Sequence, residues 1–404
     1  MAFEPLFESG SLKFLMVIDY AQAARACAKM LAVRNPDRIE AVLAEIVASG
    51  MDPWSVAVVA GPIAKTKLVQ LGVNVHAAKV LQDSGGVPVP GGVATHSYLY
   101  LPGNLADVSI PLVECESLVV SQGTNVVFPV LRKAGNLNLR GGNYSFPVLE
   151  GLNSLDMSGP GVVEIPLLLE CQRIEAMNGA RVLLPALVSA TRIDIGNSDG
   201  VHAPNLRVVL DDLGVNGSNV SLPGLIYCAH LVISNSAQAI LPNLTEAGRI
   251  DIYNAGAEVR LDVLTHIYAG LNASGSSGEV ISMQALECLA GGCSLANVRL
   301  AEPFRSLKRV VGNLDAEDSW DLSMPVLEEI LGDLTAPNSR NFSAPALASV
   351  ALSIKMAGAT GANVPLAQGL SPLLIEVVNH VGMAEIEISP DLASDHLNIE
   401  PEVA

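Results

Sequence analysis

The sequence predicts a β-solenoid with rungs of 18 to 22 residues, preceded by a small α-helical domain. Two similar stretches first indicate the repeat: LPALVSATRIDIGN begins at residue 184, and LPNLTEAGRIDIYN begins at residue 241. Their separation of 57 residues is three times nineteen, and two further copies fill the interval. A fixed short period of this kind is typical of proteins whose successive rungs stack on one another.

A common frame describes each rung when its proline is taken as position zero. Leucine follows at +2, and apolar residues occupy +8 and +10 on either side of a more variable residue. This alternation predicts one short parallel strand per rung, with +8 and +10 facing inward. The predicted core includes Leu187, Ile193, Ile195, Leu244, Ile250 and Ile252.

The period continues with some drift from about residue 97 to about residue 370, which gives roughly fourteen rungs. Residues 265–300 are irregular, and a twenty-residue version follows, with Leu307, Leu327 and Leu347 in one column. Each rung has too few apolar residues for a core of its own. Its inward side chains must therefore pack on the rungs above and below.

Asparagine recurs at intervals of nineteen where the chain leaves each predicted strand. Asparagine tolerates the left-handed backbone region, and its amide can hydrogen-bond across neighbouring turns. We therefore expect an internal structural ladder; the alternative is a column of solvent-facing turn residues. The column consists of Asn178, Asn197, Asn216, Asn235 and Asn254.

The cysteines follow the same frame. Cys171 and Cys228 occupy +5, the position that Ala190 and Ala247 hold in other rungs. A cysteine that alternates with alanine in an inward column acts as a small apolar residue, so we expect both in the core. Core packing is also the favoured interpretation of the pair in CLAGGC (288–293), against a disulfide or half a metal site.

The motif that runs from Leu222 to Asn235, with Leu-Pro-x-Leu followed by alternating apolar residues and Asn, resembles a leucine-rich repeat. It is most similar to the receptor L-domain-like and BspA-like branches, and the resemblance covers about two-thirds of the chain. The rungs here are short and marked by proline, without a full LxxLxLxxN in each. The resemblance implies the fold more strongly than any partner, because such repeats serve many ligands.

The two ends of the chain do not share the repeat. Residues 1–83 predict a helical domain, with Asn35 as an N-cap, Pro36 in the first turn and Gly50 as a terminator. This domain either caps the solenoid or docks on a partner assembly or a second copy of the chain. Residues 84–96 form a Gly/Pro linker, 97–370 the solenoid, and 371–404 a C-terminal cap with an acidic tail.

The charge of the chain restricts its partners. The net charge is −18, and residues 1–83 are neutral, so the excess of acid lies in the solenoid and tail. Such a surface repels phosphate backbones, and we expect no nucleic-acid binding. The sequence has no apolar run long enough to span a membrane and opens on no signal peptide. We therefore expect synthesis in the cytoplasm.

No catalytic, cofactor-binding or metal-binding pattern emerges from the sequence. GNSDG (196–200) matches the G-x-S-x-G motif, but it begins at the end of a predicted strand and no helix follows it. The seven histidines show neither H-x-x-x-H nor cysteine-paired spacing. We therefore expect a protein that is not an enzyme and carries no cofactor.

The leading hypothesis is a structural or attachment protein whose residues 1–83 dock on a larger assembly and whose solenoid binds a protein or a surface. A bacteriophage virion component, such as a fibre, decoration protein or adhesin, fits a chain that is made in the cytoplasm and then exposed. The alternative is an intracellular leucine-rich-repeat adaptor or effector that binds a partner protein along its sheet.

Overall fold

The computed structural model describes residues 87–89, 92–94, 98–101, 105–110, 112–235, 238–253, 259–273, 281–298, 304–356, 359, 361–364, 374–378 and 397–400. The helical domain predicted for residues 1–83 lies outside these ranges. The chain divides into two compact units, Met1–Leu187 and Val188–Ala404. Among the described residues no helix is long and apolar enough to cross a membrane.

Both units are built as parallel β-solenoid, with about 12 turns in all and rungs of ~19 residues. The solenoid prediction is therefore confirmed. The sequence-based count of roughly fourteen rungs ran from about residue 97 to about residue 370, and that interval includes residues outside the described ranges.

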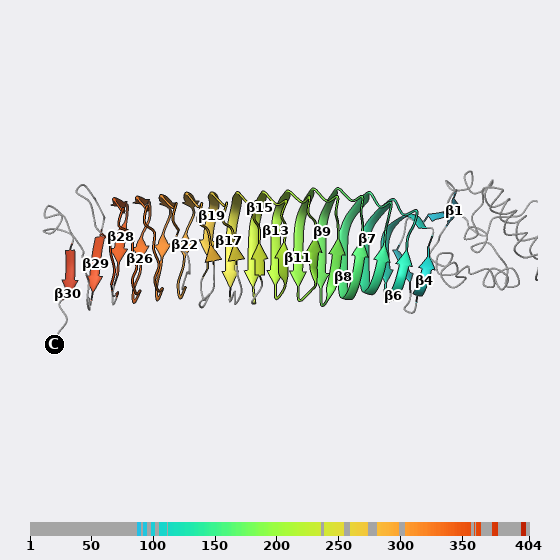
Figure 1. Cartoon of the computed structure of the whole chain (residues 1–404), viewed down its shortest axis with the longest axis horizontal. Coiled ribbons are helices and arrows are strands. Elements are labelled where there is room, and N and C mark those ends of the chain that lie inside the picture. The colour runs from blue at the N-terminus through green and yellow to red at the C-terminus, as the bar shows by residue number, and fades with distance from the viewer. Residues whose placement is uncertain are drawn as a thin grey trace, which may run out of the picture. The chain divides into compact units, whose positions relative to one another are not determined.

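The first unit consists of strands that pair with the strand one rung further along. β5 pairs in parallel with β7, β7 with β8, and β8 with β9 (Figure 1). β1 and β2 form an antiparallel pair within the predicted linker. The strands are β1 (Val87–Val89), β2 (Gly92–Ala94), β3 (Tyr98–Leu101), β4 (Leu105–Ser109), β5 (Leu112–Val120), β6 (Gly123–Val127), β7 (Lys133–Ser145), β8 (Gly151–Glu164), β9 (Glu170–Met177) and β10 (Ala180–Leu183).

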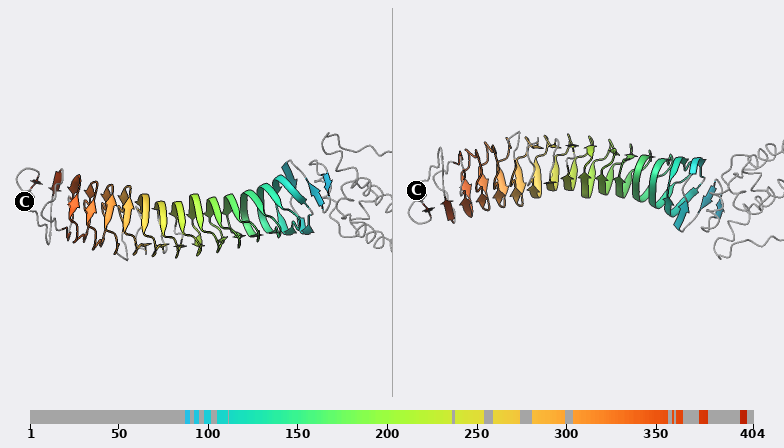
Figure 2. Two further views of the ribbon diagram at one scale, coloured as in Figure 1. Left: turned by 90° about the horizontal axis from the view of Figure 1, so that it is seen from above. Right: turned by 90° about the horizontal axis from the view of Figure 1, so that it is seen from below.

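The second unit begins with long strands that pair in parallel, β11 to β13 to β15 to β17 to β19, with a shift of register in the pairs that involve β13 and β19. In both views of Figure 2 the yellow-green strands of this part lie side by side in rung order. The long strands are β11 (Ser189–Gly196), β13 (Val208–Asn216), β15 (Tyr227–Ser234), β17 (Glu246–Tyr253) and β19 (His266–Asn272).

A second set of short strands lies between the long ones in sequence. β14, β16, β18 and β20 form a separate four-stranded parallel sheet. The prediction of one strand per rung is wrong here, because segments such as Asn219–Ser221 also alternate, with Val220 buried between two exposed residues. The short strands are β12 (Gly200–His202), β14 (Asn219–Ser221), β16 (Gln238–Ile240), β18 (Val259–Arg260) and β20 (Ile281–Ser282).

Strands become shorter in the twenty-residue rungs, where Asp318, Asp321, Asn338 and Asn341 adopt the left-handed backbone conformation and turn the chain. β29 and β30 pair in parallel within the predicted C-terminal cap and tail. The strands are β21 (Cys288–Ala290), β22 (Cys293–Ser294), β23 (Arg309–Val311), β24 (Leu314–Asp315), β25 (Glu329–Ile330), β26 (Leu334–Thr335), β27 (Ser349–Val350), β28 (Ser353–Lys355), β29 (Leu374–Val378) and β30 (Leu397–Glu400).

The recurrent proline lies in a tight turn that closes each rung. In the second unit, the Leu225 amide donates to the Leu222 carbonyl at 3.1 Å, which places Pro223 at the second position of a β-turn. The fixed φ of proline suits that position, and no strand hydrogen bond is lost there. Leu222 and Leu225 are both buried, so the turn itself contributes to the core.

Candidate functional site

The outward face of the second unit carries the most organised group of polar side chains in its described part. In β11, β15 and β17 a buried small residue at +5 is followed by a buried apolar residue at +8, as Ala247 and Ile250 illustrate in β17, whereas β13 has one extra residue between its inward Val209 and Leu213. In the first three strands two residues between the inward positions face outward, since three steps separate those positions. The outward residue directly before the second inward position, at +7 in β11, β15 and β17 and at +8 in β13, forms one column across the strands, here called the +7 column: Arg192, Asp212, His230 and Arg249.

A second outward column follows at +9, because residues two apart on a strand share a face. Asp194 and Asp251 lie in this column, and each pairs with the arginine of its own strand. The Arg192 Nε donates to Asp194 Oδ2 at 2.7 Å, and the Arg249 Nε donates to Asp251 Oδ2 at 2.9 Å. The repeated Arg-Ile-Asp thus encodes an ion pair on the outer face.

These pairs are joined into one chain of charges through the middle strands. Arg192 Nη1 also donates to Asp212 Oδ2 at 2.9 Å. His230 lies between two carboxylates, with Nδ1 at 2.8 Å from Asp212 Oδ1 and Nε2 at 2.8 Å from Asp251 Oδ2. We call the six residues the charge row: Arg192, Asp194, Asp212, His230, Arg249 and Asp251.

Both ring nitrogens of His230 face a carboxylate oxygen. His230 therefore links β13, through Asp212, to β17, through Asp251.

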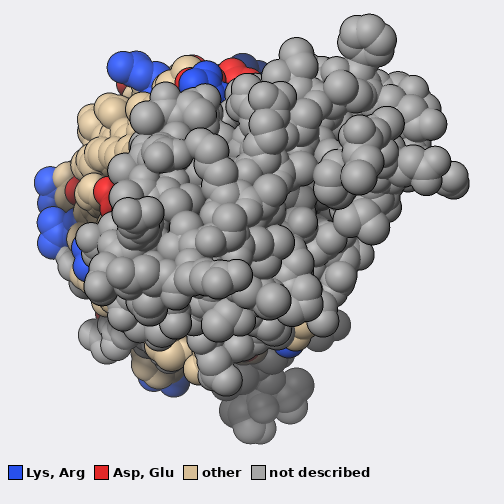
Figure 3. Space-filling model, turned by 90° about the vertical axis from the view of Figure 1, so that its right-hand side faces the viewer, with Lys and Arg blue, Asp and Glu red and all other residues tan. Residues whose placement is uncertain are grey.

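Asp251 is the buried member of the charge row, with 4% of its surface exposed. Burial alone would raise the pKa of this carboxyl, but hydrogen bonds from Arg249 and His230 reverse that effect and lower its pKa below the ordinary value. Asp251 is therefore ionised at neutral pH, and both of its carboxylate oxygens are hydrogen-bonded. On the surface seen in Figure 3, Lys and Arg likewise lie beside Asp and Glu.

The +7 column is interrupted directly after Arg249. Gly270 is the register partner of Arg249, and Gly292 precedes Cys293 as Gly270 precedes Leu271, so two neighbouring rungs have no side chain here. Gly270 has a φ of 129°, which L side chains rarely adopt. Asn313 restores the column one rung later, before Leu314.

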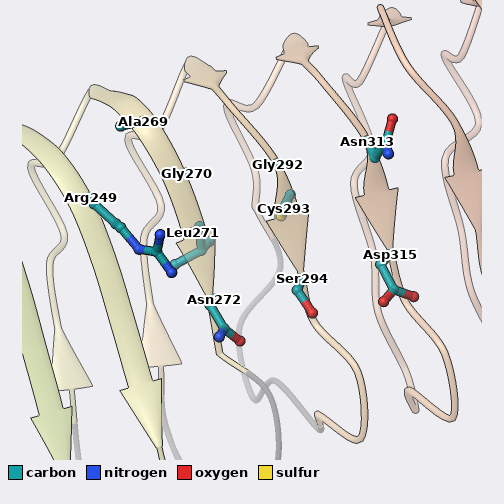
Figure 4. Close-up of a pocket in the computed structure, with 10 residues that line it drawn as sticks. All are labelled: Arg249, Ala269, Gly270, Leu271, Asn272, Gly292, Cys293, Ser294, Asn313 and Asp315. Carbon is teal, nitrogen blue, oxygen red and sulfur yellow. The ribbon is translucent and has the colours of Figure 1, made fainter.

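This interruption is an open pocket with a volume of about 290 Å³. Arg249 and Asn313 lie at its two ends and the glycine backbones form its floor (Figure 4). Asn272, Ser294 and Asp315 project along one side, because they are register partners on β19, β22 and β24. We call this site the glycine pocket.

The core residues predicted from the sequence are buried in the structure. All eight side chains have at most 4% of their surface exposed, and the cysteines lie in the +5 column among alanines. The residues are Leu187 and Cys171 in the first unit, and Ile193, Ile195, Cys228, Leu244, Ile250 and Ile252 in the second.

The asparagine column is exposed, so its predicted internal placement is wrong and the solvent-facing alternative is correct for its described members. Asn178, Asn197 and Asn235 have φ between 46° and 57°, and this left-handed turn at the strand exit directs the side chain outward. The Asn235 amide still donates to Asn216 Oδ1 at 2.7 Å. Asn254 lies outside the described residues.

Sequence reasoning missed both the charge row and the glycine pocket. His230 contacts residues 18 and 21 positions away, so short-range motif spacing does not reveal it. The repeat frame could have done so, because Arg192, His230 and Arg249 share the +7 position. Among the described residues, no group of three or more His, Cys, Asp or Glu is arranged to hold a metal ion.

Comparisons with protein-family models, curated proteins and solved structures find no match to this chain. The structure itself places the protein in the class of parallel β-solenoids.

Proposed function

We propose that this protein is a non-enzymatic structural or attachment protein that displays the outer face of its solenoid to a protein or surface ligand. The charge row supports this proposal. Six outward side chains on four neighbouring strands hold one another through hydrogen bonds of 2.7 to 2.9 Å over a buried core. A surface ordered in advance loses little side-chain entropy when it binds, which favours recognition.

Residues 1–83 would attach this surface to a larger assembly, directly or as part of a homo-oligomer. A bacteriophage virion, with the protein as a fibre, decoration protein or adhesin, is the assembly we favour. A repetitive scaffold whose outer-face arginines pair with aspartates suits a component exposed outside a cell.

Immunogold electron microscopy of particles purified from the source organism tests this proposal. An antibody raised against the solenoid should decorate the particles, and antibodies against residues 1–83 should bind only after the particles are disrupted. Finding the protein only as free molecules, with no particle labelled, would refute the attachment role.

The second candidate is an intracellular leucine-rich-repeat adaptor or effector. The buried leucine at +2, for example Leu225, Leu244 and Leu264, favours it because this column matches the repeat motif. Photo-crosslinking of the full chain in source cells separates the two candidates. An adaptor crosslinks to a soluble partner through residues 97–370, whereas the attachment protein crosslinks to its assembly through residues 1–83.

A further inference from the structure

We propose that the glycine pocket binds a neutral saccharide, one or two sugar units long. The inference deepens the proposed function, on which it rests, by naming the chemical class of the surface ligand. Shape, hydrogen-bonding capacity and local charge all support this assignment.

The shape of the pocket follows from the repeat. The strands that carry Arg249 and Asn313 are three strand spacings apart, which is about 14 Å at the usual distance between strands. The two glycine rungs between them leave a trough whose floor is backbone. A Cβ built at Gly292 meets no atom within 4 Å, so the space above this residue is open.

The pocket offers donors and acceptors from several directions. Arg249 at one end supplies only donors, and the Asp315 carboxylate supplies only acceptors. The amides of Asn272 and Asn313 and the hydroxyl of Ser294 supply both kinds of group. A sugar hydroxyl also donates and accepts, so a ring that bears several of them satisfies this mixed set.

Local charge disfavours ionic ligands. The pocket has no dominant charge of one sign: the Arg249 guanidinium at one end is already paired with Asp251, and the Asp315 carboxylate lies at the other end. The net charge of −18 of the whole chain further repels anions. A polar ligand without net charge therefore fits this pocket better than an ion does.

The donors and acceptors are held in place before a ligand arrives. Asp251 fixes the Arg249 guanidinium through two hydrogen bonds, of 2.9 Å and 3.0 Å. Leu271, Cys293 and Leu314, which flank the outward residues along their strands, are buried in the core. The Asn272 amide is also held from outside the pocket, because it donates a hydrogen bond to the Tyr253 hydroxyl.

Saturation-transfer NMR and calorimetry on the full chain test the proposal with defined probes. The neutral probes are maltose, cellobiose, lactose and diacetylchitobiose; digalacturonate and chitosan dimer are the charged comparisons. We expect at least one neutral disaccharide to bind and both charged dimers to bind at least tenfold more weakly.

Gly292→Leu is the central variant because its side chain grows into the open space of the pocket without meeting backbone. It should weaken binding of the sugar at least tenfold. Gly151→Leu is the matched control: its Cβ meets nothing closer than the flexible Lys133 side chain at 3.4 Å, and it lies outside the pocket. This control should bind as the wild type does.

Asp315→Asn provides an independent variant that removes charge with almost no change in shape, and it should reduce the affinity severalfold. If circular dichroism shows that Gly292→Leu does not fold, the affinity of Asp315→Asn for the sugar tests the proposal in its place. The proposal is overturned if no neutral disaccharide binds, if only a charged dimer binds, or if both variants bind as tightly as the wild type. Gold labelling of particles without sugar binding would refute this inference alone and leave the attachment role intact.

Discussion

Asp251 shows how one residue on the outer face depends on its neighbours and on pH. Its pKa is lowered in the folded chain, so the stability it contributes is present above the ordinary value of 3.8 and is lost as the pH falls through the folded pKa. We expect Asp251→Asn to lower the free energy of unfolding at neutral pH by about 1–3 kcal/mol, because Arg249 and His230 lose their ionised acceptor.

Thermal unfolding measured between neutral pH and pH values below 3.8 checks this prediction. The difference between wild type and Asp251→Asn should shrink as the medium becomes more acidic. Asp194→Asn is the matched control, since Asp194 pairs with Arg192 at a more exposed place and should contribute only about 0.2–1 kcal/mol. An equal loss in both variants, or a difference that persists in acid, would contradict the role given to Asp251.

The buried cysteines make a second prediction at the scale of single residues. Burial raises the pKa of Cys171 to about 11 and that of Cys228 to about 12, so almost no thiolate is present at neutral pH. We expect iodoacetamide to alkylate Cys288, which is only partly buried, well before either of them in the native protein. Mass spectrometry of tryptic peptides over time measures the order, and denaturant should abolish the difference.

Burial of single residues could be predicted because it follows from alternation alone: Ile193 and Ile195 face inward wherever a strand of this register forms. The direction in which the asparagine side chains point could not be predicted. The recurrence of Asn shows that each turn favours this residue, but not whether its side chain faces the core or the solvent. The partners of His230 also required the structure. They depend on the extra residue in β13, which shifts the register between Val209 and Asp212.

At the scale of elements, the strands are limited by where neighbouring backbones approach one another. β7 and β8 continue through a corner because glycines lie there. A Cβ at Gly142, whose φ is 99°, would lie 1.5 Å from the Gly123 carbonyl oxygen on β6. The sequence predicts the rung and its strand, but not this close contact, since glycine is also common in ordinary turns.

Gly142→Ala should therefore destabilise the first unit by at least about 2 kcal/mol, through backbone strain and steric overlap. Gly151→Ala in β8 is the control, because its Cβ has room and alanine restricts the unfolded chain; it should be neutral or stabilising by up to about 1 kcal/mol. Urea denaturation followed by circular dichroism measures both variants. Similar midpoints for the two would show that the backbones do not approach so closely.

At the scale of the whole molecule, the acidic excess opposes folding. The chain has 41 Asp and Glu against 23 Lys and Arg, and compact packing brings the unmatched acids together. Salt has two opposite effects, because it screens this repulsion and also weakens the ion pairs of the outer face. Exposed pairs contribute only about 0.2–1 kcal/mol each, so we expect relief of the net repulsion to dominate.

The thermal midpoint at pH 7 should therefore rise when NaCl increases from about 0.01 M to about 0.1 M, as the Debye length falls from ~30 Å to ~10 Å. The control is the same salt series near the isoelectric point of about 4.7, where the net charge vanishes and the rise should disappear. Differential scanning calorimetry measures both series. A midpoint that falls with salt at pH 7 would mean that the ion pairs outweigh the acidic repulsion, and that the charge row stabilises the fold more than its exposure suggests.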